Sequence, residues 1–166
     1  QYDISDLVYY FQCTKEKLSL RLSSIVENVH GLDFVPPVQL YQSILGVHGQ
    51  QWIELFAEIE KCSDYEYLIL DLTDGVADLW DILRSCTHVY TITRGDGVSL
   101  AKMDQYERGL RTMEYEDVLA KTRKIEFPIF KEIPIRFDEL TYGDLARYVR
   151  QYIIPDFAGE KEEGNE

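Results

Sequence analysis

Helical spacing of apolar residues is the clearest pattern in this chain. In residues 50–61, apolar side chains recur every three or four positions and would share one face of a helix. These side chains are Trp52, Leu55, Phe56 and Ile59. The same spacing predicts further helices at about residues 7–11, 76–83, 99–113, 115–122 and 145–152. Asp74 and Ser99 are the expected N-caps of two of these helices, and Thr141 with Asp144 fits a capping box.

Short runs of apolar and β-branched residues predict strands between these helices. The runs cover residues 32–35, 67–71, 88–93 and 124–127. Residues 18–25 alternate apolar and polar side chains, which predicts one more strand with an exposed face. Pro36 and Pro128 follow two of the runs and end them, because proline has no N–H to donate to a ladder.

This order of elements predicts an α/β fold. Strands that are separated by helices form parallel pairs through crossover connections, so we expect a mostly parallel sheet with helices on both faces. The chain has 166 residues, of which 45% are hydrophobic, and this length suits one core. We therefore expect a single domain over residues 1–155, followed by a disordered acidic tail over residues 156–166.

Charge and composition narrow the classes of partner. The formal net charge of -13 opposes binding to nucleic acids, whose phosphates attract cationic side chains, and it suits protein partners instead. No apolar run approaches the roughly 20 residues that a transmembrane helix needs, and no signal peptide is visible. Three scattered cysteines without a C-x-x-C pair suggest reduced thiols in a cytoplasmic protein. Three distant histidines offer no metal-ligand spacing, so no metal is expected.

The strongest candidate for a functional residue is Asp71. It ends the apolar run of residues 67–71, and the turn residues Asp74 and Gly75 follow it closely. A buried parallel strand would carry such a carboxylate to the carboxyl edge of the sheet, where α/β proteins bind ligands. Asp71 could equally be a hydrophilic strand end, and Asp74 with Gly75 could be only a turn and helix cap.

The expected elements around Asp71 follow one another in a fixed order: a strand ending in Asp71, an Asp74-Gly75 turn, a helix, a strand ending in Thr93 and a helix beginning near Ser99. This order resembles that of the ParA/MinD family. Members of this family are P-loop ATPases with a deviant Walker A loop. The resemblance is greatest to the TadZ/CpaE-like subgroup, which localises the Tad pilus assembly machinery. It implies that the segment ending in Asp71 is the Walker B strand and that the turn through Gly75 is switch II. Asp71, Asp74 and Gly75 would then bind nucleotide and Mg²⁺.

The chain departs from this family in two respects. It contains no G-x-x-x-x-G-K-[ST] loop to neutralise nucleotide phosphates. It also has no strand after the helix near Ser99 to supply an adenine-contacting asparagine. We therefore expect no cofactor and no confidently assigned catalytic residue in this chain, which would serve as a self-associating localisation or scaffold module. The alternative is the carboxy-terminal part of an active ATPase, with the P-loop upstream of Gln1 and ATP with Mg²⁺ as cofactors.

A receiver-domain interpretation starts from the same strand ends, Asp71 and Thr93. It would require a lysine at the end of the following strand, where the sequence has Phe127. It would also require an acidic pair after an early strand, and none is present. This interpretation is therefore the weaker one.

Overall fold

The computed structural model describes residues 2–128, 136 and 140–159. By its internal contacts the chain divides into two compact units. The first contains Gln1–Asn28 and Asp33–Phe127, and the second contains Val29–Leu32 with the described residues from Pro128 onward. A single domain over residues 1–155 stays a prediction, and residues 160–166 of the predicted acidic tail lie outside the described residues.

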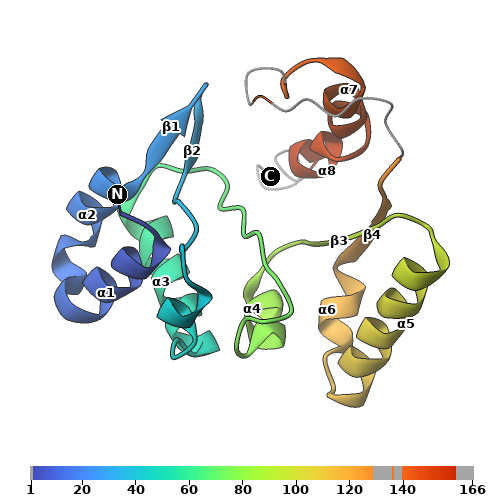
Figure 1. Cartoon of the computed structure of the whole chain (residues 1–166), viewed down its shortest axis with the longest axis horizontal. Helices are drawn as coiled ribbons and strands as arrows, with labels where there is room; N and C mark the ends of the chain where they lie inside the picture. The colour runs from blue at the N-terminus through green and yellow to red at the C-terminus, as the bar shows by residue number, and fades with distance from the viewer. Residues whose placement is uncertain (1, 129–135, 137–139, 160–166) are drawn as a thin grey trace, which may run out of the picture. The chain divides into compact units, whose positions relative to one another are not determined.

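Three helices build the first hydrophobic core of unit 1. They are α1 (Ile4–Thr14), α2 (Leu18–Ile25) and α3 (Gly49–Cys62), with a 3-10 turn at Lys15–Lys17 and another at Tyr41–Ile44. Helix α2 contacts both α1 and α3 (Figure 1). Leu7, Leu18 and Leu55 are almost fully buried between them. The helix predicted for residues 50–61 is thus confirmed, and the predicted helix at residues 7–11 is the centre of α1.

The strand predicted for residues 18–25 is wrong, because these residues form helix α2. Leu18, Leu22 and Ile25 are buried, and their spacing of four and three residues places them on one face of a helix. Leu20, which the alternating pattern grouped with them, is 75% exposed. The eight residues fit both periods, and packing against α1 and α3 favours the helix.

A short hairpin follows α2, with strands β1 (Glu27–Val29) and β2 (Leu32–Phe34). The turn residues His30 and Gly31 have φ angles of 52° and 87°. Two consecutive positive φ values are typical of the tight turns that join hairpin strands. The strand predicted at residues 32–35 is confirmed to within one residue.

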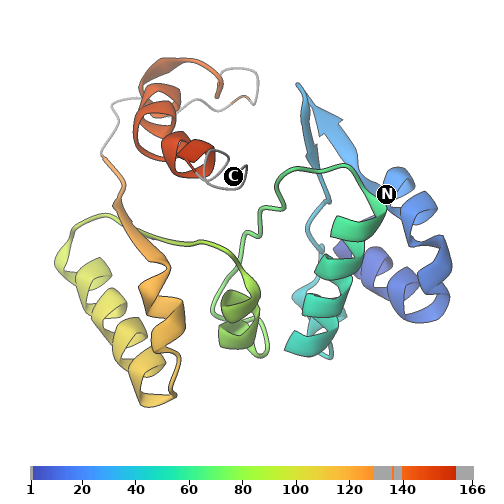
Figure 2. The same cartoon turned by 180° about the vertical axis from the view of Figure 1, so that it is seen from behind.

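A parallel crossover unit forms the second half of unit 1. Its elements are β3 (Val89–Thr93), α5 (Gly97–Thr112), α6 (Glu116–Ala120) and β4 (Thr122–Glu126). β3 and β4 pair in parallel, in a register from Val89↔Thr122 to Thr93↔Glu126 (Figure 2). Val89, Leu110 and Val118 form a second buried cluster with Leu83. The sequence predicted these four elements, and the structure confirms them.

The strand predicted for residues 67–71 is wrong, and the predicted parallel sheet is represented by the single parallel pair of β3 and β4 among the described strands. The chain between α3 and α4 (Leu79–Ser85) contains no strand (Figures 1 and 2). The fold is mixed α/β, and its described strands form two small sheets of two strands each. A central strand needs a neighbour on at least one side, and no described segment forms a ladder with residues 67–71.

The helix caps differ from those predicted. Asp96, not Ser99, is the N-cap of α5, and its carboxylate accepts a hydrogen bond from the Ser99 N–H at 2.9 Å. Asp74 does not cap α4, which begins after Asp78. In unit 2, α7 (Gly143–Tyr152) begins after Tyr142 without a side-chain cap, so the capping box of Thr141 and Asp144 is also wrong. Helix α8 (Ile154–Gly159) follows it.

Candidate functional site

The three residues predicted to bind nucleotide lie on the irregular connection between α3 and α4. Asp71, Asp74 and Gly75 are all exposed. Asp74 and Gly75 form part of a turn closed by a hydrogen bond from the Val76 N–H to the Thr73 carbonyl at 3.3 Å. Asp71 precedes this turn and does not end a strand, so the strand-end position inferred for its carboxylate is wrong. A role for these residues in binding nucleotide or Mg²⁺ stays a prediction.

The residues around Asp71 nevertheless keep the side-chain pattern of a strand. Leu70 and Leu72 pack against the first buried cluster, whereas Ile69 is 77% exposed and Asp71 is exposed. Leu72 also contacts the second cluster. From Ile69 to Leu72, alternate side chains thus face solvent and the core, which is the period of a β-strand. We call residues 68–72 the Ile69 segment.

The main chain of the Ile69 segment lacks ladder bonds. Among the residues that the structure describes, none forms a hydrogen bond with the N–H or C=O groups of residues 68–72. The main chain here is thus without a ladder partner among the described residues, although Leu70 and Leu72 are packed against the core. A main chain in this condition is able to accept a neighbouring strand.

Strand β3 pairs with β4 along one of its edges. The Val89 N–H donates to the Lys121 carbonyl at 3.2 Å, and the Thr93 carbonyl accepts from the Phe127 N–H at 2.7 Å. In a parallel ladder, alternate residues of a strand direct both main-chain groups to the same neighbour. Since Val89 and Thr93 face β4, Ile92 directs its N–H and C=O to the opposite edge. Its side chain is 65% exposed.

An open crevice lies at the carboxyl ends of β3 and β4. Its volume is about 540 Å³, and it is lined by Ile92, Thr93, Arg94, Asp96, Val98, Ser99 and Phe127. Parallel sheets commonly bind ligands at this edge. Here, however, the Asp96 carboxylate is already occupied by the N–H and hydroxyl groups of Ser99, which lower its pKa. Among its described lining residues, the crevice offers one cation, Arg94, and no base poised for proton transfer.

Asp78 joins the N-termini of helices α3 and α4. The sequence patterns did not predict this role. Its carboxylate accepts a hydrogen bond from the Gly49 N–H at 2.9 Å, although it is also the N-cap residue of α4. Its φ of 52° is in the left-handed region. An aspartate before an apolar helix is a recognisable capping signal. This signal predicts that Asp78 caps the helix that follows it. Its side chain instead accepts a hydrogen bond at the start of α3, 29 residues earlier.

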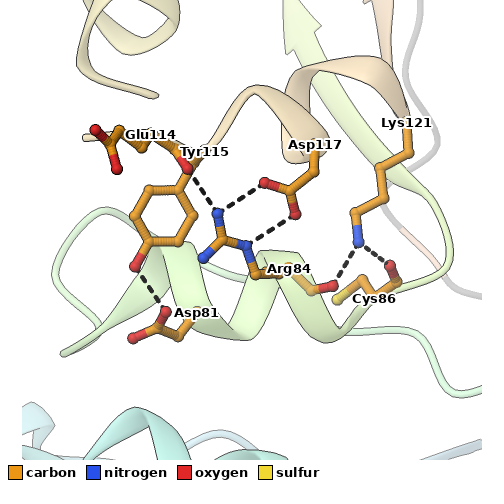
Figure 3. A network of polar contacts seen from close by, with 7 residues as sticks. All are labelled: Asp81, Arg84, Cys86, Glu114, Tyr115, Asp117 and Lys121. Carbon is orange, nitrogen blue, oxygen red and sulfur yellow. Dashed lines mark hydrogen bonds and ion pairs between the residues drawn. The ribbon is translucent and has the colours of Figure 1, made fainter. Parts of the chain in front are cut away.

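A polar network connects α4 to the turn between α5 and α6 (Figure 3). The Arg84 guanidinium donates two hydrogen bonds to the Asp117 carboxylate, at 2.8 and 2.7 Å, and a third to the Glu114 carbonyl at 2.7 Å. It also lies 3.9 Å from the centre of the Tyr115 ring. Lys121 donates to the carbonyls of Arg84 and Cys86 at the end of α4.

The electrostatics of this network are those of a structural clamp. The hydrogen bonds from Arg84 lower the pKa of Asp117, and the same pairing raises the pKa of Arg84. Tyr115 donates to the Asp81 carboxylate at 2.6 Å, and this bond raises the pKa of the phenol. These directions favour the charged forms of Arg84 and Asp117 and the neutral form of Tyr115, as in a structural ion pair with a hydrogen-bonded phenol.

Metal-binding clusters and membrane-spanning helices are both absent from the described part of the chain. Within the described residues there is no group of three or more His, Cys, Asp or Glu side chains that could hold a metal ion. None of the described helices has the length and apolar character required to cross a membrane. Comparisons with protein-family models, curated proteins and solved structures find no match to this chain.

Proposed function

We propose that this chain is a non-catalytic scaffold or localisation module that acts through protein–protein contacts. The observation that carries the proposal is the Ile69 segment, in which apolar residues are displayed on a main chain that pairs with no described strand. Leu68 is 37% exposed and Ile69 is 77% exposed. Exposed apolar residues on strand-like main chain are typical of sites that take up another protein segment.

The family assignment is part of the proposal. We propose a ParA/MinD-like module of the TadZ/CpaE type, with the Tad pilus assembly machinery as the partner to test. The parallel unit of β3, α5, α6 and β4 supports it, because crossover units of this kind build the ParA/MinD fold. The order of Asp71, the Asp74-Gly75 turn and α4 supports it as well.

The charged side chains of this chain favour a mode of action that does not depend on a nucleotide. The sequence contains no glycine-rich loop with a lysine, and phosphate binding relies on such a loop for its main-chain N–H groups and its cation. The exposed carboxylates of Asp71 and Asp74 would repel a nucleotide in the absence of Mg²⁺. We therefore propose that the module works without ATP.

Isothermal titration with ATP and Mg²⁺ tests the non-catalytic part. The expected result is heat of dilution only, for the wild-type chain and for Asp71→Asn alike. Saturable micromolar binding that Asp71→Asn abolishes would overturn the proposal in favour of an active nucleotide site. A second experiment tests the pilus part with purified Tad assembly proteins immobilised on a sensor. Absence of retention of the chain would remove the Tad machinery as its partner.

A further inference from the structure

The Ile69 segment belongs to an extended stretch of chain with contacts at both of its ends. Residues 67–73, between α3 and α4, contain no helix, bend or turn (Figure 1). Before this stretch, the Tyr65 hydroxyl donates to the Asp33 carboxylate at 2.9 Å. After it, the Val76 N–H closes a turn on the Thr73 carbonyl at 3.3 Å. Because the segment is already extended, pairing with a partner strand orders little of this chain, which lowers the cost of binding.

The solvent face of the segment displays an apolar side chain next to an acidic one. Ile69 and Asp71 are two residues apart, so an extended chain directs both to the same side. Ile69 is 77% exposed and Asp71 is exposed. In an added strand, the residues opposite these two would have their Cβ atoms within about 4.5–5.5 Å of them. The face therefore favours a partner with one apolar and one basic residue, two positions apart.

The charge of the surrounding chain also favours a basic partner. Residues 63–78 contain five acidic residues and no lysine, arginine or histidine. All five are exposed: Asp64, Glu66, Asp71, Asp74 and Asp78. Asp64, Asp71 and Asp74 form no ion pair with any described residue. Opposite charge speeds the encounter with a basic segment, and like charge opposes an acidic one.

We propose that the Ile69 segment binds a basic, extended segment of another protein, which adds a strand along residues 68–72. An apolar side chain of that partner lies opposite Ile69, and a lysine or arginine lies opposite Asp71. The inference rests on the proposed function, because it names the chemistry of the partner that the scaffold takes at this site. A second copy of the chain is disfavoured as the occupant, since it carries the same formal net charge of -13.

Fluorescence anisotropy with labelled peptides and the full chain tests this inference at about 150 mM NaCl. The probe is Thr-Lys-Thr-Val-Thr-Lys-Thr, in which valine and both lysines share one face of a strand. Its sequence reads the same in both directions, so it suits a parallel and an antiparallel partner alike. We expect saturable binding with a Kd below about 1 mM.

Two control peptides separate strand pairing from simple charge attraction. Thr-Thr-Lys-Val-Lys-Thr-Thr has the same composition and charge, but its lysines and its valine lie on opposite faces of a strand. Thr-Glu-Thr-Val-Thr-Glu-Thr keeps the alternation and reverses the charge. Both should bind at least about fivefold more weakly than the probe.

Substitutions in the chain locate the site. Asp71→Lys should weaken binding of the lysine probe at least about fivefold and strengthen binding of the glutamate peptide. Asp104→Lys is the matched control, because it makes the same change of charge at an exposed position on α5. Ile69→Gln should also weaken the probe, whereas Leu20→Gln, at a position that is 75% exposed on α2, should not. Circular dichroism verifies that each variant is folded.

Several outcomes would overturn the inference: no saturable binding of the probe, equal binding of either control peptide, or equal effects of the control substitutions. Sedimentation velocity provides one more. A dimer of the chain that Ile69→Gln abolishes would assign the segment to a second copy instead. A chain that binds no ATP and is retained by Tad assembly proteins, yet does not bind the probe, would refute this inference alone, so its failure is distinguishable from failure of the proposed function.

Discussion

The Asp78 carboxylate accepts a hydrogen bond from the Gly49 N–H at 2.9 Å and so satisfies a donor at the start of α3. The two residues approach so closely that only glycine fits at position 49. A Cβ atom added there would lie 2.5 Å from the Asp78 Cβ and 3.2 Å from the Asp78 carbonyl oxygen. This contact holds the N-termini of α3 and α4 together.

Gly49→Ala should therefore destabilise the chain, by about 1–3 kcal/mol, because the main chain at Asp78 has to move. Gly97→Ala is the matched control. Gly97 also begins a helix, α5, and an added Cβ there meets nothing within 4 Å. The control should be neutral or stabilising by up to about 1 kcal/mol. Urea unfolding measures both, and equal effects would contradict the close approach.

Asp117→Asn should change how stability depends on pH. Arg84 lowers the pKa of Asp117 in the folded state, so the carboxylate stabilises the fold above its unfolded pKa of about 3.9. That stabilisation is lost as the pH falls through the lower, folded pKa. The wild type should be more stable than Asp117→Asn near neutral pH, and the difference should close as Asp117 becomes protonated.

Thermal unfolding between about pH 7 and pH 2 measures this difference. Asp104→Asn is the control, because Asp104 forms a simple exposed ion pair with Arg108 at 3.0 Å. Such surface pairs contribute little, so the control should follow the wild type throughout. A difference between wild type and Asp117→Asn that stays constant down to the lowest pH would contradict the pairing with Arg84.

Leu110→Ala should cost about 2–5 kcal/mol, because it leaves a cavity in the second buried cluster. Leu110 is 0% exposed there. Leu100 lies on the same helix and is 53% exposed, so Leu100→Ala should change stability by no more than about 0.5 kcal/mol. Chemical unfolding of the two variants compares them directly. Equal losses would mean that α5 does not present Leu110 to the core.

The cysteines should react with a thiol reagent in a defined order. Cys13 is exposed, whereas Cys62 and Cys86 are partly buried and burial raises the pKa of both thiols. The reactive species is the thiolate, so Cys62 and Cys86 should react more slowly near pH 8. Mass spectrometry after timed labelling measures the order, and Cys13→Ser should remove the fast phase.

Several elements were predictable because their signal is local. Helix α3 follows from apolar spacing alone, and β3 follows from its β-branched residues. The α5 helix and strand β4 were located to within a few residues, since capping residues and Pro128 mark their limits. Of the candidate site, the sequence placed Asp74 and Gly75 correctly in one turn.

The sequence by itself therefore determined which segments are amphipathic and where the chain turns, since these properties depend on neighbouring residues. Tertiary structure decided the rest. Packing made α2 a helix although its pattern also fits a strand. The Ile69 segment kept strand periodicity although no described segment forms a ladder with it. The pairings of Asp78 with Gly49 and of Arg84 with Asp117 join residues 29 and 33 positions apart. No local pattern encodes such contacts, because they form only when separate helices pack together.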